Sequence, residues 1–128
     1  AKAGVEEQSG WVRARDYRRS SGYQLMRECY QELGRYPRLL FTGSITLLEG
    51  ALAFISDNRH FDIAPQRIIT FDDHNLLDCL PLRIDSIEQD SQALATASLE
   101  KLLCMINEKK QPSSETIPAR LHWRSRRS

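Results

Sequence analysis

The chain alternates between short apolar runs and longer stretches in which apolar residues recur every three or four positions. The runs RLLFT at 38–42 and RIITF at 67–71 predict buried strands, the first of them covered on both faces. The stretches 21–33 and 45–56 have the period of helices with one buried side. This alternation predicts an α/β fold in which flanking helices cover a parallel sheet.

Signals for helix ends surround the first of these helices. The serines at 20–21 offer an N-cap hydroxyl, Gly34 can adopt the left-handed C-cap conformation, and Pro37 prevents the helix from continuing. We therefore expect the helix to end near Leu33. Residues 12–15, which precede it, are expected to form a short strand.

The second half of the chain has a looser pattern. The stretch HNLLDCLP at 74–81 has no clean period, which suits a crossover between structural units, whereas residues 82–89 alternate like a strand. Asp90 or Ser91 can then cap a long helix. Its apolar stripe consists of Leu94, Ala95, Leu99, Leu102, Leu103 and Ile106. Residues 117–123 alternate again and predict an outer strand with one solvated face.

Composition narrows the class of protein without identifying it. The 128 residues, 41% hydrophobic and 27% charged, match a soluble globular domain, and the longest apolar run, 45–55, is too short to span a bilayer. Eighteen basic and seventeen acidic residues give a net charge of +1, so bulk charge does not indicate nucleic-acid binding. The arginine-rich stretches near 13–19 and 120–127 are interpreted as solvated surface.

The three cysteines point to a reducing compartment. They form no C-x-x-C pair and have no histidine at the spacing of metal ligands, so we expect reduced packing thiols in a cytoplasmic protein and no metal site. Neither Cys29 nor Ser44 stands in a recognisable arrangement for nucleophilic catalysis.

Polar residues follow three of the predicted strands. Gly43 and Ser44 follow the first, the sequence Asp72-Asp73-His74 the second, and Gln89-Asp90-Ser91 the third. Ligands of parallel α/β folds collect at this edge. A pair of carboxylates there can bind the hydroxyls of a polyol, hold Mg²⁺ or cap a turn. Tyr17, ahead of the first helix, is either core or a ring offered to a ligand.

A family resemblance favours the polyol. The succession SSGYQLM at 20–26, LLFTGSITLLEGAL at 39–52, IITFDD at 68–73 and RIDSIEQDSQALATASLEKLL at 83–103 resembles the C-terminal part of the lactose/galactose repressor family. The match continues through ETIPARLHWR at 115–124. TFDDHNLLD followed by LRIDSIEQD is particularly similar to the sucrose operon repressors, with the fructose repressors somewhat further away.

The resemblance implies a periplasmic-binding-protein type I fold, in which two α/β subdomains clamp a small ligand. Residues 11–75 would then supply part of the C-terminal subdomain, residues 82–110 part of the N-terminal subdomain, and residues 115–128 a returning strand and basic tail. The segments 74–81 and 111–115 would be crossovers. We expect the DNA-reading headpiece to be absent, so that operator DNA is bound only through a domain outside this chain.

The resemblance also implies a function and its residues. Tyr17 would stack on the effector, Asp72 would bind its hydroxyls and Gln89 would line the pocket, with Ser44 and Asp73 as secondary contacts. Many relatives have an Asn-Asp pair where this chain has Ser44-Ile45, which leaves the ligand open among fructose, sucrose and a phosphorylated fructose. The protein would be a sugar-sensing repressor that shifts between conformations, with no enzymatic step and no cofactor.

Family members dimerise through two surfaces, which correspond here to Glu49 and Leu52 and to Leu76, Leu77 and Leu80. The alternative for the leucines is a place in the core, and Glu49 is unusual in a symmetric dry contact because two like charges would meet. For the whole protein, an exported sugar-binding protein of the same fold remains an alternative. A small Mg²⁺-dependent enzyme that uses Asp72 and Asp73 is another, although no lysine follows a later strand.

Overall fold

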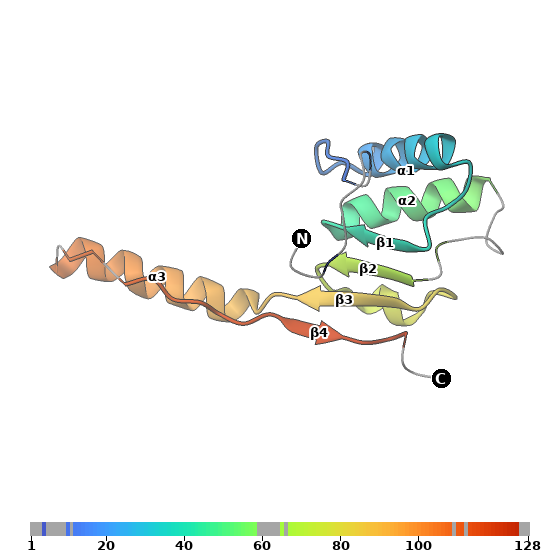
Figure 1. Ribbon diagram of the computed structural model, residues 1–128. Helices are drawn as coiled ribbons and strands as arrows, with labels where there is room; N and C mark the ends of the chain where they lie inside the picture. Colours follow the sequence, from blue (N-terminus) through green and yellow to red (C-terminus); the bar gives the residue numbers. More distant parts are fainter. Residues whose placement is uncertain are drawn as a thin grey trace.

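The computed structural model describes residues 12–58, 67–108 and 113–125, together with residues 4, 10, 65, 110 and 111. Its one described sheet has the strand order β1-β2-β3-β4, and the first three strands are parallel while the fourth is antiparallel to β3 (Figure 1). The strands are β1 (Leu39–Thr42), β2 (Arg67–Phe71), β3 (Ile84–Glu88) and β4 (Arg120–His122). The predicted α/β class is thus confirmed, and the runs at 38–42 and 67–71 do contain strands.

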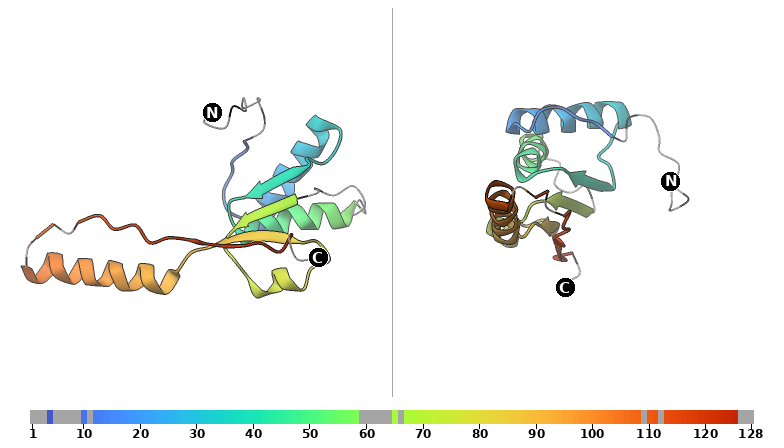
Figure 2. Two further views of the ribbon diagram at one scale, coloured as in Figure 1. Left: turned by 60° about the horizontal axis from the view of Figure 1, so that its bottom comes forward. Right: turned by 90° about the vertical axis from the view of Figure 1, so that its left-hand side faces the viewer.

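The helices are α1 (Arg19–Leu33), α2 (Ile45–Asp57), the short 3-10 helix η2 (Asn75–Asp78) and α3 (Ser91–Glu108). Helix α2 lies on one face of the sheet, and α1 packs on α2 (Figure 2). The sheet with α1, α2 and η2 is called the body below. Within the described residues, no helix is both long and apolar enough to cross a membrane.

Local chemistry explains where the body's helices begin and end. The Ser44 hydroxyl accepts the Leu47 N–H at 3.2 Å and caps α2, while Gly34, with φ of 66°, ends α1 as predicted. The predicted serine cap of α1 is wrong. That helix begins at Arg19 without a side-chain cap, because the Ser21 hydroxyl donates to Asp16 instead.

The two helices of the body cross at a pair of glycines. A Cβ atom added to Gly22 would lie 2.3 Å from the carbonyl oxygen of Leu47, and one added to Gly50 would lie 2.1 Å from that of Arg19. Both distances are far below van der Waals contact, so only glycine allows the backbones to approach this closely. The crossing therefore sets the position of α1 over α2 and of the loop before α1.

Residues 12–16 do not form the predicted strand. They run without regular structure along α1, and Arg13 and Arg15 pair with Glu32 and Glu28 of that helix. Ion pairs to a helix, rather than ladder hydrogen bonds, therefore position the segment that carries Tyr17.

Two apolar clusters form the core of the body. One lies between α1 and α2 and contains Met26, Tyr36, Ala51, Phe54 and Ile55. The other lies between α2, the sheet and η2 and contains Leu48, Ile68, Leu77 and Ile84. Burial of these aliphatic and aromatic side chains is the main stabilising term of the body.

The opposite face of the sheet has no described helix against it. Leu39 and Phe41 of β1 are therefore exposed on that face, as are Leu121 and in part Trp123 near β4. The expectation that the 38–42 strand is covered on both faces is wrong for this chain, because its apolar residues on one face have nothing in the described residues to pack against.

The topology also corrects two predicted boundaries. Strand β3 pairs with β2, so residues 84–88 belong to the sheet of the body and not with α3. The segment 74–81 consequently connects two neighbouring strands of one sheet and is not a crossover between units. Residue 11 and residues 126–128, at the ends of two predicted ranges, lie outside the described residues.

Helix α3 projects away from the body, with the returning chain beside it (Figures 1 and 2). Lys101 donates to the Ser113 carbonyl at 2.6 Å and lies 3.6 Å from a Glu115 carboxylate oxygen. Helix α3 and residues 113–117 are called the arm below. Helix α3 starts after Asp90 as predicted, but none of its residues is buried, and its predicted apolar stripe is exposed.

Candidate functional site

Three predicted site residues lie at one edge of the sheet. Ser44 follows β1, Asp72 follows β2 and Gln89 follows β3, and the register pairs Thr42 with Thr70 and Phe71 with Ile87. The carboxyl ends of these parallel strands all point toward the base of the arm (Figure 1). The structure therefore brings the three residues to the edge at which parallel α/β folds bind ligands.

Tyr17 reaches the same edge from the loop before α1. A Cβ atom added to Gly43 would lie 3.9 Å from Cε1 of the Tyr17 ring, which puts the ring against the turn that precedes Ser44. The Tyr17 side chain is 70% exposed, so it is not core filler in this chain. An exposed ring beside polar strand ends is suited to cover the apolar face of a sugar.

Asp72 has an unusual backbone conformation. Its φ of 75° makes it the one non-glycine residue with positive φ in the described part of the chain. Its N–H donates to the Ile87 carbonyl at 2.9 Å, so the link to β3 holds the strained residue in place. Strain of this kind, of about 1–3 kcal/mol, is common at binding sites. The exposed carboxylate has no hydrogen-bond or ion-pair partner among the described residues, and it is free to accept ligand hydroxyls.

Ser44 and Gln89 have more limited freedom. The Ser44 oxygen already accepts the Leu47 N–H, which leaves the hydroxyl proton available for donation. Gln89 is exposed, and its carbonyl accepts the Ser91 N–H at 2.9 Å as the chain turns into α3. Ser44 can thus donate a hydrogen bond to a ligand, and the side-chain amide of Gln89 can donate or accept one.

The Asp73 side chain points inward, so its carboxylate is not placed as a simple ligand contact. Its Oδ1 accepts hydrogen bonds from the Ser86 hydroxyl at 2.6 Å and from Arg124 at 2.8 Å. Burial acts to raise the pKa of Asp73, but the bonds from Ser86 and Arg124 outweigh it and lower the pKa below its ordinary value. Asp73 is consequently ionised at neutral pH and anchors the C-terminal segment.

Arg124 is the residue that sequence reasoning missed. It was interpreted as part of a solvated basic tail, yet it is 6% exposed and also donates to Asp78 at 2.8 Å. Burial acts to lower the pKa of Arg124, whereas Asp78 and Asp73 raise it above its ordinary value. The available signal was the alternation after residue 120, which places Arg124 on the face opposite Leu121 and Trp123.

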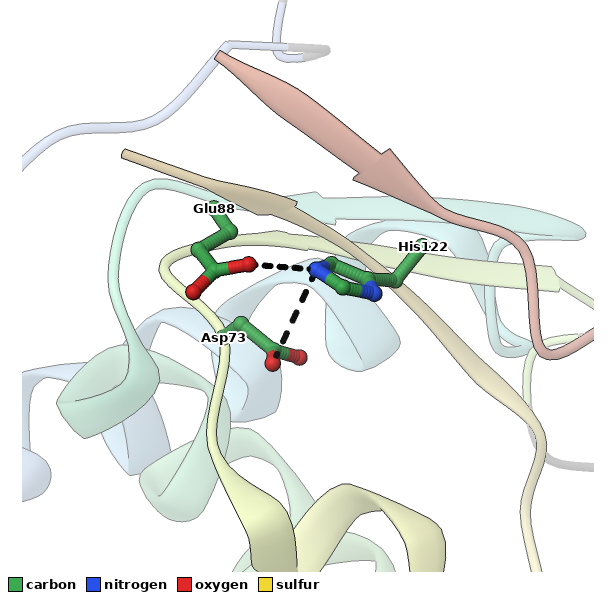
Figure 3. A group of neighbouring side chains, drawn as sticks. All are labelled: Asp73, Glu88 and His122. Atoms are coloured by element: carbon green, nitrogen blue, oxygen red, sulfur yellow. Dashed lines mark hydrogen bonds and ion pairs between the residues drawn. The ribbon is translucent and has the colours of Figure 1, made fainter. Parts of the chain in front are cut away.

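A second missed group lies beside this anchor (Figure 3). The Nε2 atom of His122 is 2.6 Å from a Glu88 carboxylate oxygen and 3.9 Å from Oδ2 of Asp73. The three side chains come from β4, from the end of β3 and from the turn after β2. The alternation of β3 and β4 puts Glu88 and His122 on the face that η2 also covers.

The residues predicted for dimerisation have mixed environments. Glu49 and Leu76 are exposed, and Leu52 and Leu80 are half-buried against the core clusters. Leu77 is only 5% exposed and belongs to the core of the body. The interface prediction is wrong for Leu77, for which the alternative of a core position holds, because η2 turns its side chain under the sheet.

Comparison with known proteins identifies relatives of the chain as a whole. The chain is 37% identical over 125 residues to the sucrose operon repressor of Klebsiella pneumoniae, a match that covers 97% of this chain and 37% of that protein. It is 33% identical over 89 residues to the fructose operon regulatory protein of Vibrio cholerae serotype O1, covering 70% of this chain and 27% of that protein. The chain thus spans little more than a third of the longer-matching relative. No family model matches it.

Solved structures share the fold. The Cra transcriptional dual regulator of Pseudomonas putida in complex with fructose 1-phosphate matches with a TM-score of 0.77 and 30% identity, covering 87% of this chain and 41% of that one. The lac repressor bound to ONPG in its repressed state matches with a TM-score of 0.68 and 22% identity, covering 85% of this chain and 33% of that one. The chain is therefore a homologue of the sucrose operon repressor and of the fructose operon regulatory protein, and it has the fold of the lactose repressor family.

Proposed function

We propose that this chain is the effector-binding and dimerising part of a transcription repressor that responds to a sugar. The observation that carries the proposal is the meeting of Tyr17, Asp72 and Gln89 at one edge of the sheet, in a chain whose relatives regulate sucrose and fructose operons. These relatives are regulators and not enzymes, and the proposal includes no bond-breaking step.

The chemistry of the edge fits a sugar. The Asp72 carboxylate accepts two neighbouring hydroxyls, Ser44 and Gln89 supply further hydrogen bonds, and the Tyr17 ring covers the apolar face. Fructose, sucrose and a phosphorylated fructose are the ligands to test. A structural relative is described as a complex with fructose 1-phosphate, which makes that compound the first choice.

The arm supports a two-subdomain organisation. The body would be part of one subdomain, and α3 with residues 113–117 would pack in the other, because its apolar residues are otherwise exposed. The ligand would then lie between the edge of the body and the second subdomain. Its binding would favour one orientation of the two, which changes how a dimer presents its DNA-reading domains in the cytoplasm.

The dimer surface in this proposal is formed by Glu49, Leu52, Leu76 and Leu80. Leu76 is the strongest of these, because its side chain is 62% exposed on η2. Operator DNA is a partner of the whole protein and not of the residues of this chain.

The test is isothermal titration calorimetry of the full-length protein with fructose, sucrose and fructose 1-phosphate. Asp72→Asn should weaken binding by about 1.5–3 kcal/mol, which is tenfold or more, because one charge-assisted acceptor is lost. Tyr17→Ala should cost about 1 kcal/mol, whereas Tyr17→Phe, which keeps the ring, should bind like the wild type.

Asp57→Asn is the matched control, since Asp57 is an exposed carboxylate at the C-terminal end of α2, away from the edge. Its sugar affinity should be unchanged. Binding of Mg²⁺ that Asp72→Asn abolishes, without any response to the three sugars, would contradict the proposal and favour a metal-dependent enzyme. Equal sugar affinity in the wild type and Asp72→Asn would remove Asp72 from the site.

A further inference from the structure

We propose that Asp73, Glu88 and His122 bind a divalent transition-metal ion, for which Zn²⁺ is the best fit. One ligand atom from each residue lies within 4.8 Å of the other two. The three side chains converge from three different elements on one point, as Figure 3 shows. The proposal is independent of which sugar the protein senses.

The donor set selects the class of ion. One imidazole nitrogen and two carboxylate oxygens are ligands for zinc and its first-row neighbours, whereas Mg²⁺ and Ca²⁺ prefer ligand sets of oxygen alone. Three protein ligands leave a fourth tetrahedral position for water. The side chains of Asp73, Glu88 and His122 are 17%, 44% and 31% exposed, so an ion can enter from solvent.

The geometry requires only small side-chain movements. Ligands about 2.0–2.1 Å from a tetrahedral zinc ion lie about 3.3 Å apart. The Nε2 atom of His122 is 2.6 Å from a Glu88 carboxylate oxygen and 3.9 Å from Oδ2 of Asp73. The spacing of ligand atoms in a tetrahedral zinc site lies between these two distances. Glu88, at the end of β3 and half-exposed, can move away while His122 turns toward Asp73.

Neighbouring groups orient the Asp73 ligand. Its Oδ1 is held by Ser86 and Arg124, and this arrangement leaves Oδ2 directed at His122. Hydrogen bonds to the distal oxygen of a ligating carboxylate are typical of metal sites, where they fix the orientation of the ligand. The buried Arg124 is fixed in turn by the exposed Asp78, so a network centred on a buried guanidinium positions the ligand.

The charge balance favours a dication. Asp73, Glu88 and Asp78 contribute three negative charges and Arg124 one positive charge, which leaves two negative charges among these four side chains. Arg120, the register partner of Glu88, has an exposed side chain and makes no ion pair among the described residues. A bound ion would join β3 to β4, the two strands between which the arm leaves and returns.

The test uses tag-free full-length protein stripped of metal with EDTA. Calorimetry with Zn²⁺ should show one ion bound per chain, and Co²⁺ should give the visible absorption of a tetrahedral site. His122→Gln keeps a hydrogen-bond donor toward Glu88 but offers no imidazole. Glu88→Gln replaces the carboxylate by an amide of equal size. Each should weaken Zn²⁺ binding at least tenfold and abolish the Co²⁺ band.

Two substitutions serve as controls. Glu115→Gln removes an exposed carboxylate of the arm, and His74→Gln removes an exposed imidazole outside the cluster. Both should keep the affinity of the wild type. Thermal unfolding without metal shows whether each variant is folded, and Zn²⁺ should raise the Tm of the wild type and of the controls only. Equal Zn²⁺ affinity in the wild type, His122→Gln and Glu88→Gln would overturn the proposal, as would a wild type that binds no Zn²⁺.

Discussion

Helix α2 of the body and helix α3 of the arm have similar sequence patterns and opposite environments. Both repeat apolar residues at helical spacing, but α2 buries Leu48, Ala51 and Ile55, whereas α3 buries none of its residues. The helical period of the apolar residues therefore predicts that one face of the helix is to be covered. It does not identify the part of the protein that covers this face. In α2 the cover lies within this chain, in α1 and the sheet.

The largest expected effect comes from removing Arg124, the buried cation that holds the C-terminal segment against the body. Arg124→Met should lower the free energy of unfolding by about 3–5 kcal/mol, because it leaves the inward-facing Asp73 carboxylate without its buried partner. Chemical denaturation gives the value. Arg120→Met, four residues earlier in β4, removes an exposed guanidinium and should cost less than about 0.5 kcal/mol. Equal costs would show that the buried network contributes nothing specific.

A matched pair of truncations sharpens the comparison directly. Leu48→Ala should destabilise the 128-residue chain by about 3 kcal/mol, because Leu48 is 1% exposed in the core. Leu102→Ala, at a side chain that is 52% exposed on α3, should cost less than about 0.5 kcal/mol in the same chain. In the full-length protein the cost of Leu102→Ala should increase if the arm packs in a second subdomain. A cost that stays small there would contradict the proposed organisation.

The glycine crossing gives a somewhat smaller effect. Gly50→Ala should lower the unfolding free energy by about 2 kcal/mol, since the new methyl group meets the backbone of α1 and the two helices must separate. The control is Gly43→Ala, where an added Cβ meets only the Tyr17 ring at an ordinary 3.9 Å. If Gly50→Ala is as stable as this control, the close approach of the helices is not tight in solution.

The smallest effect concerns pH. Since the folded-state pKa of Asp73 lies below its ordinary value of 3.8, its ionised form stabilises the fold above that pH. This contribution is lost as the pH falls below 3.8 and through the folded-state pKa. The stability difference between the wild type and Asp73→Asn, measured by urea denaturation, should therefore narrow on acidification.

The sequence allowed the body to be predicted well because its signals are local. The end of α1 at Gly34, the start of α2 after Ser44 and the strands at 39–42 and 67–71 each depend on neighbouring residues. The prediction of a serine cap for α1 was wrong because a second local partner, Asp16, binds the Ser21 hydroxyl. Local propensity does not show which of two nearby polar partners is chosen.

The site was predicted only in part because its remaining residues come together through tertiary structure. Asp72 and Gln89 were found from their places after strands, and Tyr17 from a family resemblance. Arg124 and His122 were not found, since their roles depend on β4 pairing antiparallel to β3. A basic tail and a buried anchor have the same composition, and only the register separates them.

The pairing of Arg124 with Asp73 spans 51 positions of the chain, and Ser125 likewise holds Asp85 from 40 positions away. A nascent polypeptide emerging from the ribosome has made both carboxylates, with Ser86 as a partner for Asp73 and Arg67 as a partner for Asp85, long before it supplies Arg124 and Ser125. The parallel strands that carry or precede these acids are synthesised first, and the entire arm is synthesised before Arg124 and Ser125. Completion of the body is consequently a late event in biosynthesis, and the arm has the first opportunity to find its own neighbours.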